Sequence, residues 1–463
     1  MVFCLFPMMK GTDMNDYFYP RITISGARGI VGRDITVETA QRMAWAYAAY
    51  LGGGDIILGR DARPTGEMMR AAVVAGLLAG GANVIDVGLV PTPTVGIMIR
   101  ECQAKGGIAI TASHNPVEWN ALKLFAEDGT FPDQSFVEGY VNYLYQGEFE
   151  HTTWCGVGVV RDHPMALDIH CRYVEEAIDV PRIRQKEMTV VVDGCRSVGG
   201  IFLPALLTRM GCKVIDLDCT PDGQFTRGME PTPENLTRLC RVVKEENADI
   251  GFAVDPDADR LAVVSNEGQA IGEEFTLALA AHAVLSDRPG QAVATNLSTS
   301  MLTDHAAQQF GGTVYRTPIG EANVVTGIRE HQAVIGGEGN GGVMYPAVHV
   351  GRDAMAAAAL VLKLLADTGK TLSAIVAEYP NYIILKDKVE MDLDRATSRL
   401  QEIATSEMQG QIDTRDGVKI TRENAWLHMR CSNTEPIVRI IAEGVGREET
   451  ESLLNEGKRL LGG

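Results

Sequence analysis

Aromatic residues are few in this sequence, and it has neither long apolar runs nor an excess of basic charge. Aromatic residues make up 6% of the 463 residues, and 42 lysines and arginines stand against 60 aspartates and glutamates. The formal net charge of −18 makes nucleic acid and anionic membrane surfaces poor partners. No apolar run approaches the roughly 20 residues that a membrane-spanning helix needs. An anionic small substrate is compatible with this charge only where cations are gathered locally.

Cysteine pairs at metal-like or disulfide-like spacing are missing as well. The nine cysteines are an odd number without a CxxC pair. This usage is typical of reduced thiols, so we expect a cytoplasmic protein. The apolar start from Val2 to Met9 lacks the basic leader and the small-residue cleavage site of a signal peptide. Met14 is an alternative start, which would make the earlier residues an extension.

A strand–helix unit is repeated three times before about residue 380. A chain of 463 residues exceeds what one hydrophobic core supports, which indicates two to four domains. The copies end in the strands Gly107 to Ile110, Ile250 to Val254 and Ala333 to Ile335, each followed by a polar loop. This alternation predicts similar α/β domains with mixed, mainly parallel sheets. In the second copy we expect a helix from Glu234 to about Asn247.

The pattern changes after about Asn381. Four strands are predicted there, together with helices near Asp394 to Met408 and Glu448 to Leu461. This arrangement is typical of a separate α+β domain with a mostly antiparallel sheet.

The loop Thr111-Ala112-Ser113-His114-Asn115-Pro116 follows the last strand of the first copy. It places the Ser113 hydroxyl at the carboxyl end of a strand, where parallel α/β sheets bind ligands. Asn115-Pro116 forces a turn, because the residue before proline is pushed out of the helical region. A serine beside a histidine is also a common turn residue, so this loop alone leaves both a structural and a catalytic interpretation open.

Asp255, Asp257 and Asp259 follow the last strand of the second copy. In an extended loop this spacing turns three carboxylates toward one point, which suits a hard divalent cation such as Mg²⁺. A solvated acidic turn is the alternative, although three carboxylates together repel one another without a cation. Arg260 comes next, where it can pair with a carboxylate or contact a transferring phosphoryl group.

The loop of the third copy contains Glu338 and Asn340 among four glycines. Glycines let a backbone approach a ligand closely, and these two side chains offer donors and acceptors for sugar hydroxyls. A plain glycine-rich turn is the alternative.

A fourth loop, Arg430 to Pro436, joins two predicted strands of the C-terminal domain, and Arg439 follows on the second strand. Two guanidiniums and two hydroxyls around a tight loop predict a phosphate site, with a structural hairpin as the alternative. The candidate contacts are Arg430, Ser432, Asn433, Thr434 and Arg439.

In this order, the four loops resemble the motifs of the α-D-phosphohexomutases, which include phosphoglucosamine mutase and phosphomannomutase/phosphoglucomutase. The resemblance covers nearly the whole chain, including Ser25-Gly26-Ala27-Arg28-Gly29. It implies a heart-shaped enzyme whose four domains each lend one loop to a central cleft. We expect the phosphoserine domain at residues 1–155, the metal domain at 156–262, the sugar domain at 263–372 and the phosphate domain at 373–463.

The resemblance also implies roles. Ser113 matches the family's phosphoserine, and the three aspartates, with Ser113, match its Mg²⁺ ligands. Arg28, Lys123 and Arg260 match basic residues around the phosphoserine, where the family's acid/base work is assigned. His114, beside the serine, completes the predicted catalytic set.

The sugar loop departs from the family's pattern. It often reads Gly-Glu-x-Ser-Gly-His in bacterial members, whereas Asn340 replaces the serine here and Gly342 replaces the histidine. His349, a few residues on, is our candidate for the missing side chain. The departure bears on substrate choice and not on the reaction.

We therefore predict a phosphohexomutase that interconverts hexose 6-phosphate and hexose 1-phosphate. Phosphorylated Ser113 gives its phosphoryl group to the sugar monophosphate, and the resulting hexose 1,6-bisphosphate, intermediate and activator, turns around and rephosphorylates the serine. Mg²⁺ offsets the charge in transfer, and Lys123 takes the hydroxyl proton. Glucosamine phosphate is our first choice of substrate, with phosphomannomutase/phosphoglucomutase activity as the alternative. Monomer and homodimer both stay open.

Two other classes share part of this pattern. A metal-dependent phosphatase with a serine nucleophile would use Ser113 and the aspartates, but it has no use for a second phosphate site on a separate domain. A catalytically silent sugar-phosphate sensor is disfavoured by the intact serine, aspartates and Lys123.

Overall fold

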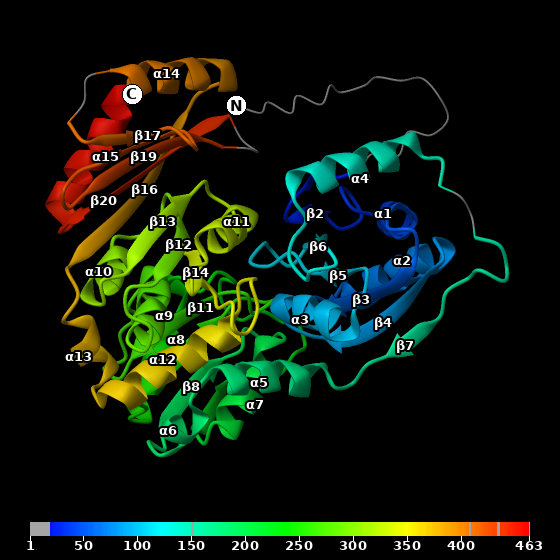
Figure 1. Cartoon of the computed structure of the whole chain (residues 1–463), viewed down its shortest axis with the longest axis horizontal. Helices are drawn as coiled ribbons and strands as arrows, with labels where there is room; N and C mark the ends of the chain where they lie inside the picture. Colours follow the sequence, from blue (N-terminus) through cyan, green and yellow to red (C-terminus); the bar gives the residue numbers. More distant parts are fainter. Residues whose placement is uncertain (1–18, 150–151, 407–408, 433–435, 463) are drawn as a thin grey trace.

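The computed structural model describes residues 19–149, 152–406, 409–432 and 436–462. Four sheets follow one another along the chain, and we call the parts built on them domains 1 to 4 (Figure 1). None of the helices in these ranges combines the length and the apolar character needed to cross a membrane. The eight cysteines in these ranges are free thiols.

Domain 1 has a seven-stranded sheet in the order β1-β2-β6-β5-β3-β4-β7. Strands β5, β3 and β4 run parallel, whereas β6 returns antiparallel to β5. The strands are β1 (Ile22–Thr23), β2 (Gly26–Ile30), β3 (Gly54–Arg60), β4 (Ala82–Leu89), β5 (Gly106–Ile110), β6 (Trp119–Phe125) and β7 (Val160–Asp162). The helices are α1 (Val37–Tyr50), α2 (Gly66–Ala79), α3 (Thr92–Cys102) and α4 (Gln134–Gln146).

Domains 2 and 3 each have a four-stranded sheet, in the orders β11-β10-β8-β9 and β13-β12-β14-β15. Domain 2 comprises α5 (Ala166–Ala177), α6 (Val180–Arg184), β8 (Thr189–Asp193), α7 (Gly199–Arg209), β9 (Lys213–Leu217), the 3₁₀ helix η1 (Pro233–Asn235), α8 (Thr237–Glu245), β10 (Ile250–Val254) and β11 (Leu261–Ser265). Domain 3 comprises α9 (Glu274–Leu285), β12 (Ala292–Asn296), α10 (Leu302–Gln309), β13 (Thr313–Thr317), α11 (Glu321–His331), β14 (Ile335–Glu338), β15 (Gly342–Met344), α12 (Ala354–Thr368) and α13 (Leu372–Val376).

The prediction of mixed, mainly parallel sheets is confirmed, and the structure shows where the antiparallel strands lie. In each α/β domain the third predicted strand pairs with an antiparallel partner that follows it: β5 with β6, β10 with β11 and β14 with β15. Each polar loop is therefore the connection between two paired strands, which fixes both of its ends. The single helix expected from Glu234 is wrong, because the chain leaves helical geometry at Leu236 and η1 and α8 form separately.

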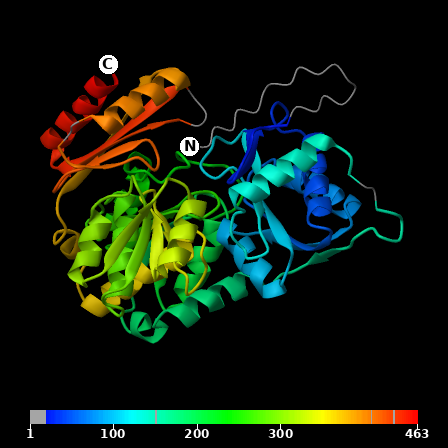
Figure 2. The same cartoon turned by 45° about the horizontal axis from the view of Figure 1, so that its top comes forward.

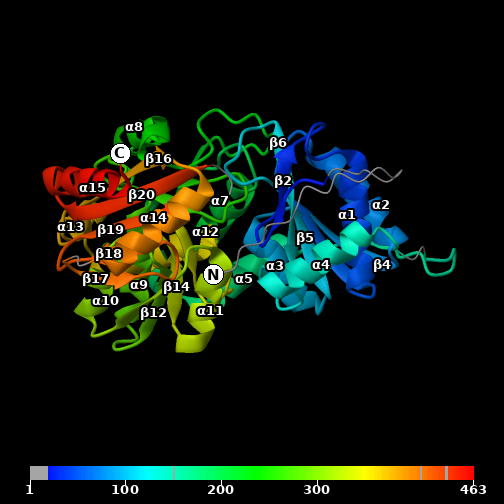
Figure 3. The same ribbon diagram turned by 90° about the horizontal axis from the view of Figure 1, so that it is seen from above.

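Domain 4 has an antiparallel sheet in the order β16-β20-β19-β18-β17, as the sequence predicts. Its elements are β16 (Tyr382–Glu390), α14 (Leu393–Thr405), β17 (Gln411–Asp413), β18 (Val418–Thr421), β19 (Trp426–Cys431), β20 (Ile437–Val445) and α15 (Arg447–Leu461). The predicted end of the first helix at Met408 lies outside the described residues. The domain lies beside domain 3, on the side away from most of domain 1 (Figure 2, Figure 3).

One apolar core runs through domains 1, 2 and 3. It includes Val95 and Ile99 of α3, Phe202 of α7 and the length of α12, whereas domain 4 has a core of its own. Helix α12 is buried along almost its whole length. The sequence analysis did not predict this helix, because a helix that is apolar all round lacks the amphipathic period.

A buried polar contact joins the same three domains at the start of α12. The Asp353 carboxylate accepts from the Met355 and Ala356 amides as N-cap and lies 2.9 Å from His170 Nε2 of α5. The other ring nitrogen of His170 lies 2.8 Å from Thr94 Oγ1 of α3. Burial opposes ionisation of Asp353, but His170 and the helix amides hold the pKa of this carboxyl below its usual range.

We expect Asp353→Ala to lower the melting temperature much more than Asp133→Ala does. Asp133 is an exposed N-cap of α4 that accepts from the Phe136 amide, so its loss costs about 1 kcal/mol. Asp353→Ala also removes the partner of a buried histidine, and breaking a buried pair costs about 3 kcal/mol or more. Thermal unfolding of both variants followed by circular dichroism checks this, and equal shifts would contradict it.

Candidate active site

The Ser113 loop is buried and held in an uncommon backbone conformation. Ser113 has a φ of +51° and is 2% exposed, although it lies in a loop. Its amide donates to Thr111 Oγ1 at 3.0 Å, and its hydroxyl donates to Asp255 Oδ2 at 2.8 Å. A positive φ at a residue other than glycine persists only where the surroundings enforce it, and such strain gathers at functional sites.

Arg63, at the end of β3, enforces this conformation. Its guanidinium is fully buried and donates to the carbonyls of Ser113, Asn115, Pro116 and Trp119. Asp61 Oδ2 accepts from Arg63 Nε at 3.1 Å and from Thr111 Oγ1 at 2.6 Å. The sequence analysis missed both residues, although Asp61-Ala62-Arg63 follows a parallel strand, as Ser113 does.

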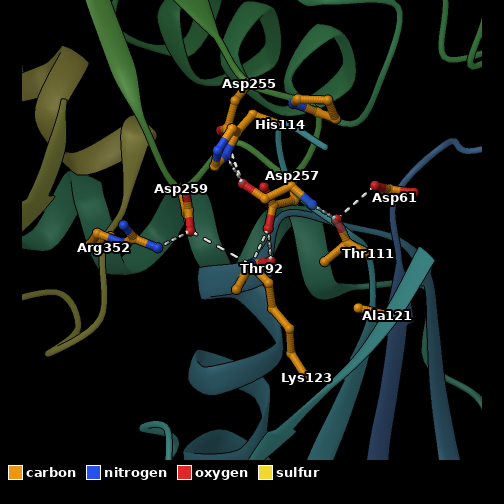
Figure 4. Close-up of polar contacts among 12 residues, drawn as sticks. Asp61, Thr92, Thr111, His114, Ala121, Lys123, Asp255, Asp257, Asp259 and Arg352 are labelled. Carbon is orange, nitrogen blue, oxygen red and sulfur yellow. Dashed lines mark hydrogen bonds and ion pairs between the residues drawn. The ribbon is translucent and has the colours of Figure 1, made fainter. Parts of the chain in front are cut away.

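The three aspartates gather at one buried point directly after β10. Oxygens of Asp255, Asp257 and Asp259 lie within 4.8 Å of one another, and each residue is at most 1% exposed (Figure 4). Asp257 Oδ1 and Asp259 Oδ1 are buried and have no hydrogen-bond partner within the described part of the chain. Buried carboxylate oxygens without donors fit a hard cation, so the residues present suit Mg²⁺.

Electrostatics distinguish the aspartates from one another. Burial, with the neighbouring Asp259 and Asp257, raises the pKa of Asp255 well above its usual range. Burial also favours a higher pKa for Asp257. The nearby Lys123 has the larger effect, however, and the pKa of this carboxyl lies far below its usual range. Asp257 Oδ2 also accepts from Thr92 Oγ1 at 2.5 Å. Domain 1 therefore supplies partners for all three carboxylates, since Ser113 contacts Asp255 and Lys123 also pairs with Asp259.

The predicted basic residues surround this cluster, but not as one group. Lys123 on β6 is fully buried, with its Nζ 2.6 Å from Asp257 Oδ2 and 3.7 Å from Asp259 Oδ2. Arg28 Nη1 donates to Asn115 Oδ1 at 3.3 Å, and burial lowers the pKa of this guanidinium. Arg260 pairs with Glu230 at 3.0 Å. Lys123 thus lies among carboxylates, whereas the two arginines flank the serine loop and the cluster.

His114 contacts the serine directly. Its Nδ1 lies 3.3 Å from Ser113 Oγ. Burial, with Arg260 nearby, lowers the pKa of His114 to about 4. The ring is therefore neutral at neutral pH and can exchange a hydrogen bond with the hydroxyl without adding charge.

The sugar loop begins at the end of β14. Glu338 is buried, and its Oε1 accepts from Asn296 Nδ2 at 2.9 Å and from the Gly320 amide at 3.3 Å. Its Oε2 pairs with Arg352 at 3.1 Å. Asn340 Oδ1 accepts from the Gly342 amide at 3.1 Å, which shapes the turn into β15.

His349 is not among the partners of Glu338 in the described residues, although the sequence made it our candidate for the missing side chain of the sugar loop. His349 is buried against α3, where a Cβ on Gly96 would lie 2.6 Å from the imidazole. Burial lowers the pKa of His349 to about 4. The side chain beside Glu338 is instead Arg352, which also pairs with Asp259 Oδ2 at 2.7 Å. The analysis missed Arg352, although it belongs to the same short segment after β15.

The fourth predicted loop brings two arginines together. Arg430 of β19 and Arg439 of β20 are opposite one another in register. Like charges at paired positions are unfavourable without an anion, and Asp416 Oδ1 accepts from Arg430 Nε at 3.1 Å. Ser432 is buried, and its amide donates to the Ile437 carbonyl. Asn433 and Thr434 lie outside the described residues.

Asp416 ties this loop to the sugar loop. Its Oδ2 accepts from the Ile319 amide at 3.0 Å, and the next amide, Gly320, donates to Glu338. Polar contacts therefore lead from Arg430 through Asp416 and the Ile319–Gly320 backbone to Glu338, and from there through Arg352 to Asp259. The structure brings together loops from all four domains.

Models of the four domains of phosphoglucomutase/phosphomannomutase match residues 22–146, 168–268, 273–382 and 385–457. A probable phosphoglucosamine mutase of Methanopyrus kandleri is 38% identical over 93% of this chain and 95% of its own length. A phosphoglucomutase/phosphomannomutase of Thermococcus kodakarensis is 36% identical over 94% and 97%.

Solved structures agree with the sequence relatives. A putative phosphomannomutase from Thermus thermophilus superposes with a TM-score of 0.82 at 26% identity, over 96% of this chain and 99% of the other. Family models cover most of the chain, and curated relatives match nearly all of it. The chain therefore belongs to the phosphoglucomutase/phosphomannomutase family of α-D-phosphohexomutases, and it is an enzyme of the isomerase class.

Proposed function

We propose that this phosphohexomutase works through a phosphoserine at Ser113 and that its preferred reaction converts glucosamine 6-phosphate to glucosamine 1-phosphate. One observation carries the first part: Ser113 Oγ of domain 1 lies 2.8 Å from Asp255 Oδ2 of the carboxylate cluster in domain 2. A phosphoryl group on this oxygen would lie next to a cation held by the aspartates, which is where phosphoryl transfer needs positive charge.

Asp255, Asp257 and Asp259 would hold Mg²⁺, with the phosphoryl group of Ser113 as the further ligand. The bound cation supplies positive charge to the phosphoryl oxygens during transfer. Arg28 and Arg260 would contact the same oxygens, because each keeps a buried Nε without a hydrogen-bond partner in the described residues. Each of these N–H groups can donate a charge-assisted hydrogen bond to a phosphoryl oxygen. Neutral His114 would orient the Ser113 oxygen.

Lys123 is the proposed general base. Its amine is fully buried within 4 Å of two carboxylates of the cluster, so it can take the proton of an attacking hydroxyl only after it has released its own, which the nearby cations Arg28, Arg260 and Mg²⁺ would favour. Glu338 and Asn340 would accept the sugar hydroxyls in both orientations of the intermediate. Both orientations are needed, because the hexose 1,6-bisphosphate must return its other phosphate to Ser113.

The far phosphate would bind between Arg430 and Arg439, with Ser432, Asn433 and Thr434 as further contacts. A paired-arginine site on a separate domain favours a mutase over a serine phosphatase, which handles one phosphate at a time. The comparisons give no support to a phosphatase. We also propose that the enzyme is cytoplasmic and that it is a monomer or a homodimer.

The substrate proposal follows the names of relatives such as the Methanopyrus kandleri protein, with phosphomannomutase/phosphoglucomutase activity as the alternative. A coupled assay with glucosamine, glucose and mannose 6-phosphates, each started with its 1,6-bisphosphate, tests it. The highest kcat/KM is expected with glucosamine 6-phosphate. A preference of tenfold or more for mannose or glucose phosphate would select the alternative.

We expect Ser113→Ala to abolish turnover and to remove the phosphate that intact-mass spectrometry detects on the purified enzyme. The reason is that the substitution removes the hydroxyl that contacts Asp255 of the carboxylate cluster and that would carry the phosphoryl group. Ser135→Ala is the matched control, because its hydroxyl contacts only Asp133 on the surface of α4. More than a few per cent of activity in Ser113→Ala would show that the carrier is another residue.

Metal removal should stop the reaction, and Asp257→Asn should lower Mg²⁺ affinity and turnover together. The substitution removes one negative oxygen ligand from the cluster. We expect at least a tenfold loss of Mg²⁺ affinity by titration calorimetry. Asp168→Asn, which weakens an exposed pair with Arg209 in the same domain, should change neither quantity. Full activity after prolonged EDTA treatment would rule out the metal.

Arg430→Ala should weaken binding of the sugar monophosphate by about 2–3 kcal/mol, the scale of a charge-assisted bidentate pair. That is an increase in KM of about 30- to 150-fold, with Ser113 phosphorylation unchanged. More free bisphosphate should also escape, because its far end is no longer held. Arg399→Ala, which breaks an exposed pair with Glu402 in the same domain, serves as control. An unchanged KM without extra escape would mean that the loop is only a hairpin.

A further inference from the structure

Arg352 is a side chain that contacts both the metal loop and the sugar loop. It lies just before α12 and is 9% exposed. Its Nη2 is 2.7 Å from Asp259 Oδ2 (Figure 4). Its Nη1 is 3.1 Å from Glu338 Oε2, and its Nε is 2.9 Å from Glu321 Oε2. A planar guanidinium presents donors in fixed directions, so it can hold several carboxylates in a set geometry.

These contacts determine which oxygens remain available to ligands. Arg352 occupies Oδ2 of Asp259, and the other oxygen, Oδ1, is buried without a hydrogen-bond partner in the described residues. Arg352 likewise occupies Oε2 of Glu338, whose Oε1 is held by Asn296. One guanidinium thus orients a carboxylate of the metal cluster and a carboxylate of the sugar loop at the same time.

The glycine at position 342 makes room for this side chain. A Cβ on Gly342 would lie 2.2 Å from Arg352 Cδ and 2.9 Å from its Cγ. The φ of Gly342 is not positive, so its backbone would accept another residue. Glycine is therefore required at position 342 because a side chain there would collide with Arg352. This explains why the sugar loop has glycine where the family's pattern often has histidine.

We propose that Arg352 is a positioning residue that orients Asp259 for the metal and Glu338 for the sugar, so that both loops depend on it. The proposal rests on the proposed function only in taking these loops as the metal and sugar sites. Outer residues that orient a metal ligand change metal affinity by about 10- to 100-fold when they are removed. The same removal leaves Glu338 without its charged partner, which should raise KM for the sugar phosphate.

The first test measures Mn²⁺ binding to the full-length resting enzyme by electron paramagnetic resonance, which requires no turnover. Arg352→Gln is expected to weaken Mn²⁺ binding about 10- to 100-fold and to raise KM for glucosamine, glucose and mannose 6-phosphates. Arg352→Lys should restore at most one of the two properties, because an ammonium cannot span both carboxylates as a fork does. Unchanged Mn²⁺ affinity in folded Arg352→Gln, or recovery of both properties by lysine, would overturn the proposal.

Lys363→Met is the matched control. Lys363 is a buried cation within α12, but it pairs with Asp287 and Asp367, which belong to neither loop. Its replacement should leave Mn²⁺ affinity and KM unchanged, and thermal unfolding of each variant shows whether it folds. An equal loss of Mn²⁺ affinity in Lys363→Met would mean that any buried cation of this region has the same effect, which would overturn the proposal.

The second test does not depend on how Arg352 variants fold. Gly342→Ala alters no charge and no ligand, but its methyl group must displace Arg352. We expect it to weaken Mn²⁺ binding several-fold in the wild-type background and to have no further effect in Arg352→Gln. Equal effects in both backgrounds would overturn the proposal. Mn²⁺ results as expected in an enzyme without mutase activity would instead reject the proposed function and leave the role of Arg352 standing.

Discussion

The site depends on one electrostatic constraint: its charges are buried, and their partners come from other domains. Lys123 of domain 1 pairs with Asp257 of domain 2, and Arg352 of domain 3 pairs with Asp259. A buried charge that loses its partner costs several kcal/mol, so each of these domains stabilises the site of another. This explains why the three domains share one apolar core, which fixes the distances that the charge pairs require.

Domain 4 is attached in a different way. Its apolar core is separate, and buried polar contacts join it to domain 3. Glu443 accepts from the Ser300 hydroxyl and the Met301 amide, and Lys419 donates to the Leu297 carbonyl. Glu443 and Lys419 are both buried, so charges without contact to water hold domain 4 to domain 3, as they do at the site.

In the sugar loop, the glycine at position 342 and the arginine at position 352 depend on each other. A glycine at position 342 would leave a gap beside Glu338, and Arg352, ten residues later, fills it with a longer side chain that reaches the metal loop as well. Glu338 is thereby paired with a guanidinium, which is always charged and presents its donors as a rigid fork. His349 is then free to pack as a neutral ring against α3, where its pKa is lowered to about 4 by burial.

The sequence by itself determined the fold class, the order of the four loops and the residues that carry them, because parallel strands and polar strand ends are local patterns. It correctly placed Ser113 and the three aspartates at strand ends, but it could not show that they meet, since the Ser113–Asp255 contact joins residues of separate domains.

The antiparallel partners β6, β11 and β15 and the buried helix α12 were not predicted, because their apolar residues follow no distinct period. Arg63, Arg352 and Asp416 were missed for a related reason: each acts through contacts with carbonyls or carboxylates distant in sequence. Only the tertiary structure decided which charge pairs with which, because a buried ion pair is set by the packing of domains and not by the spacing of residues.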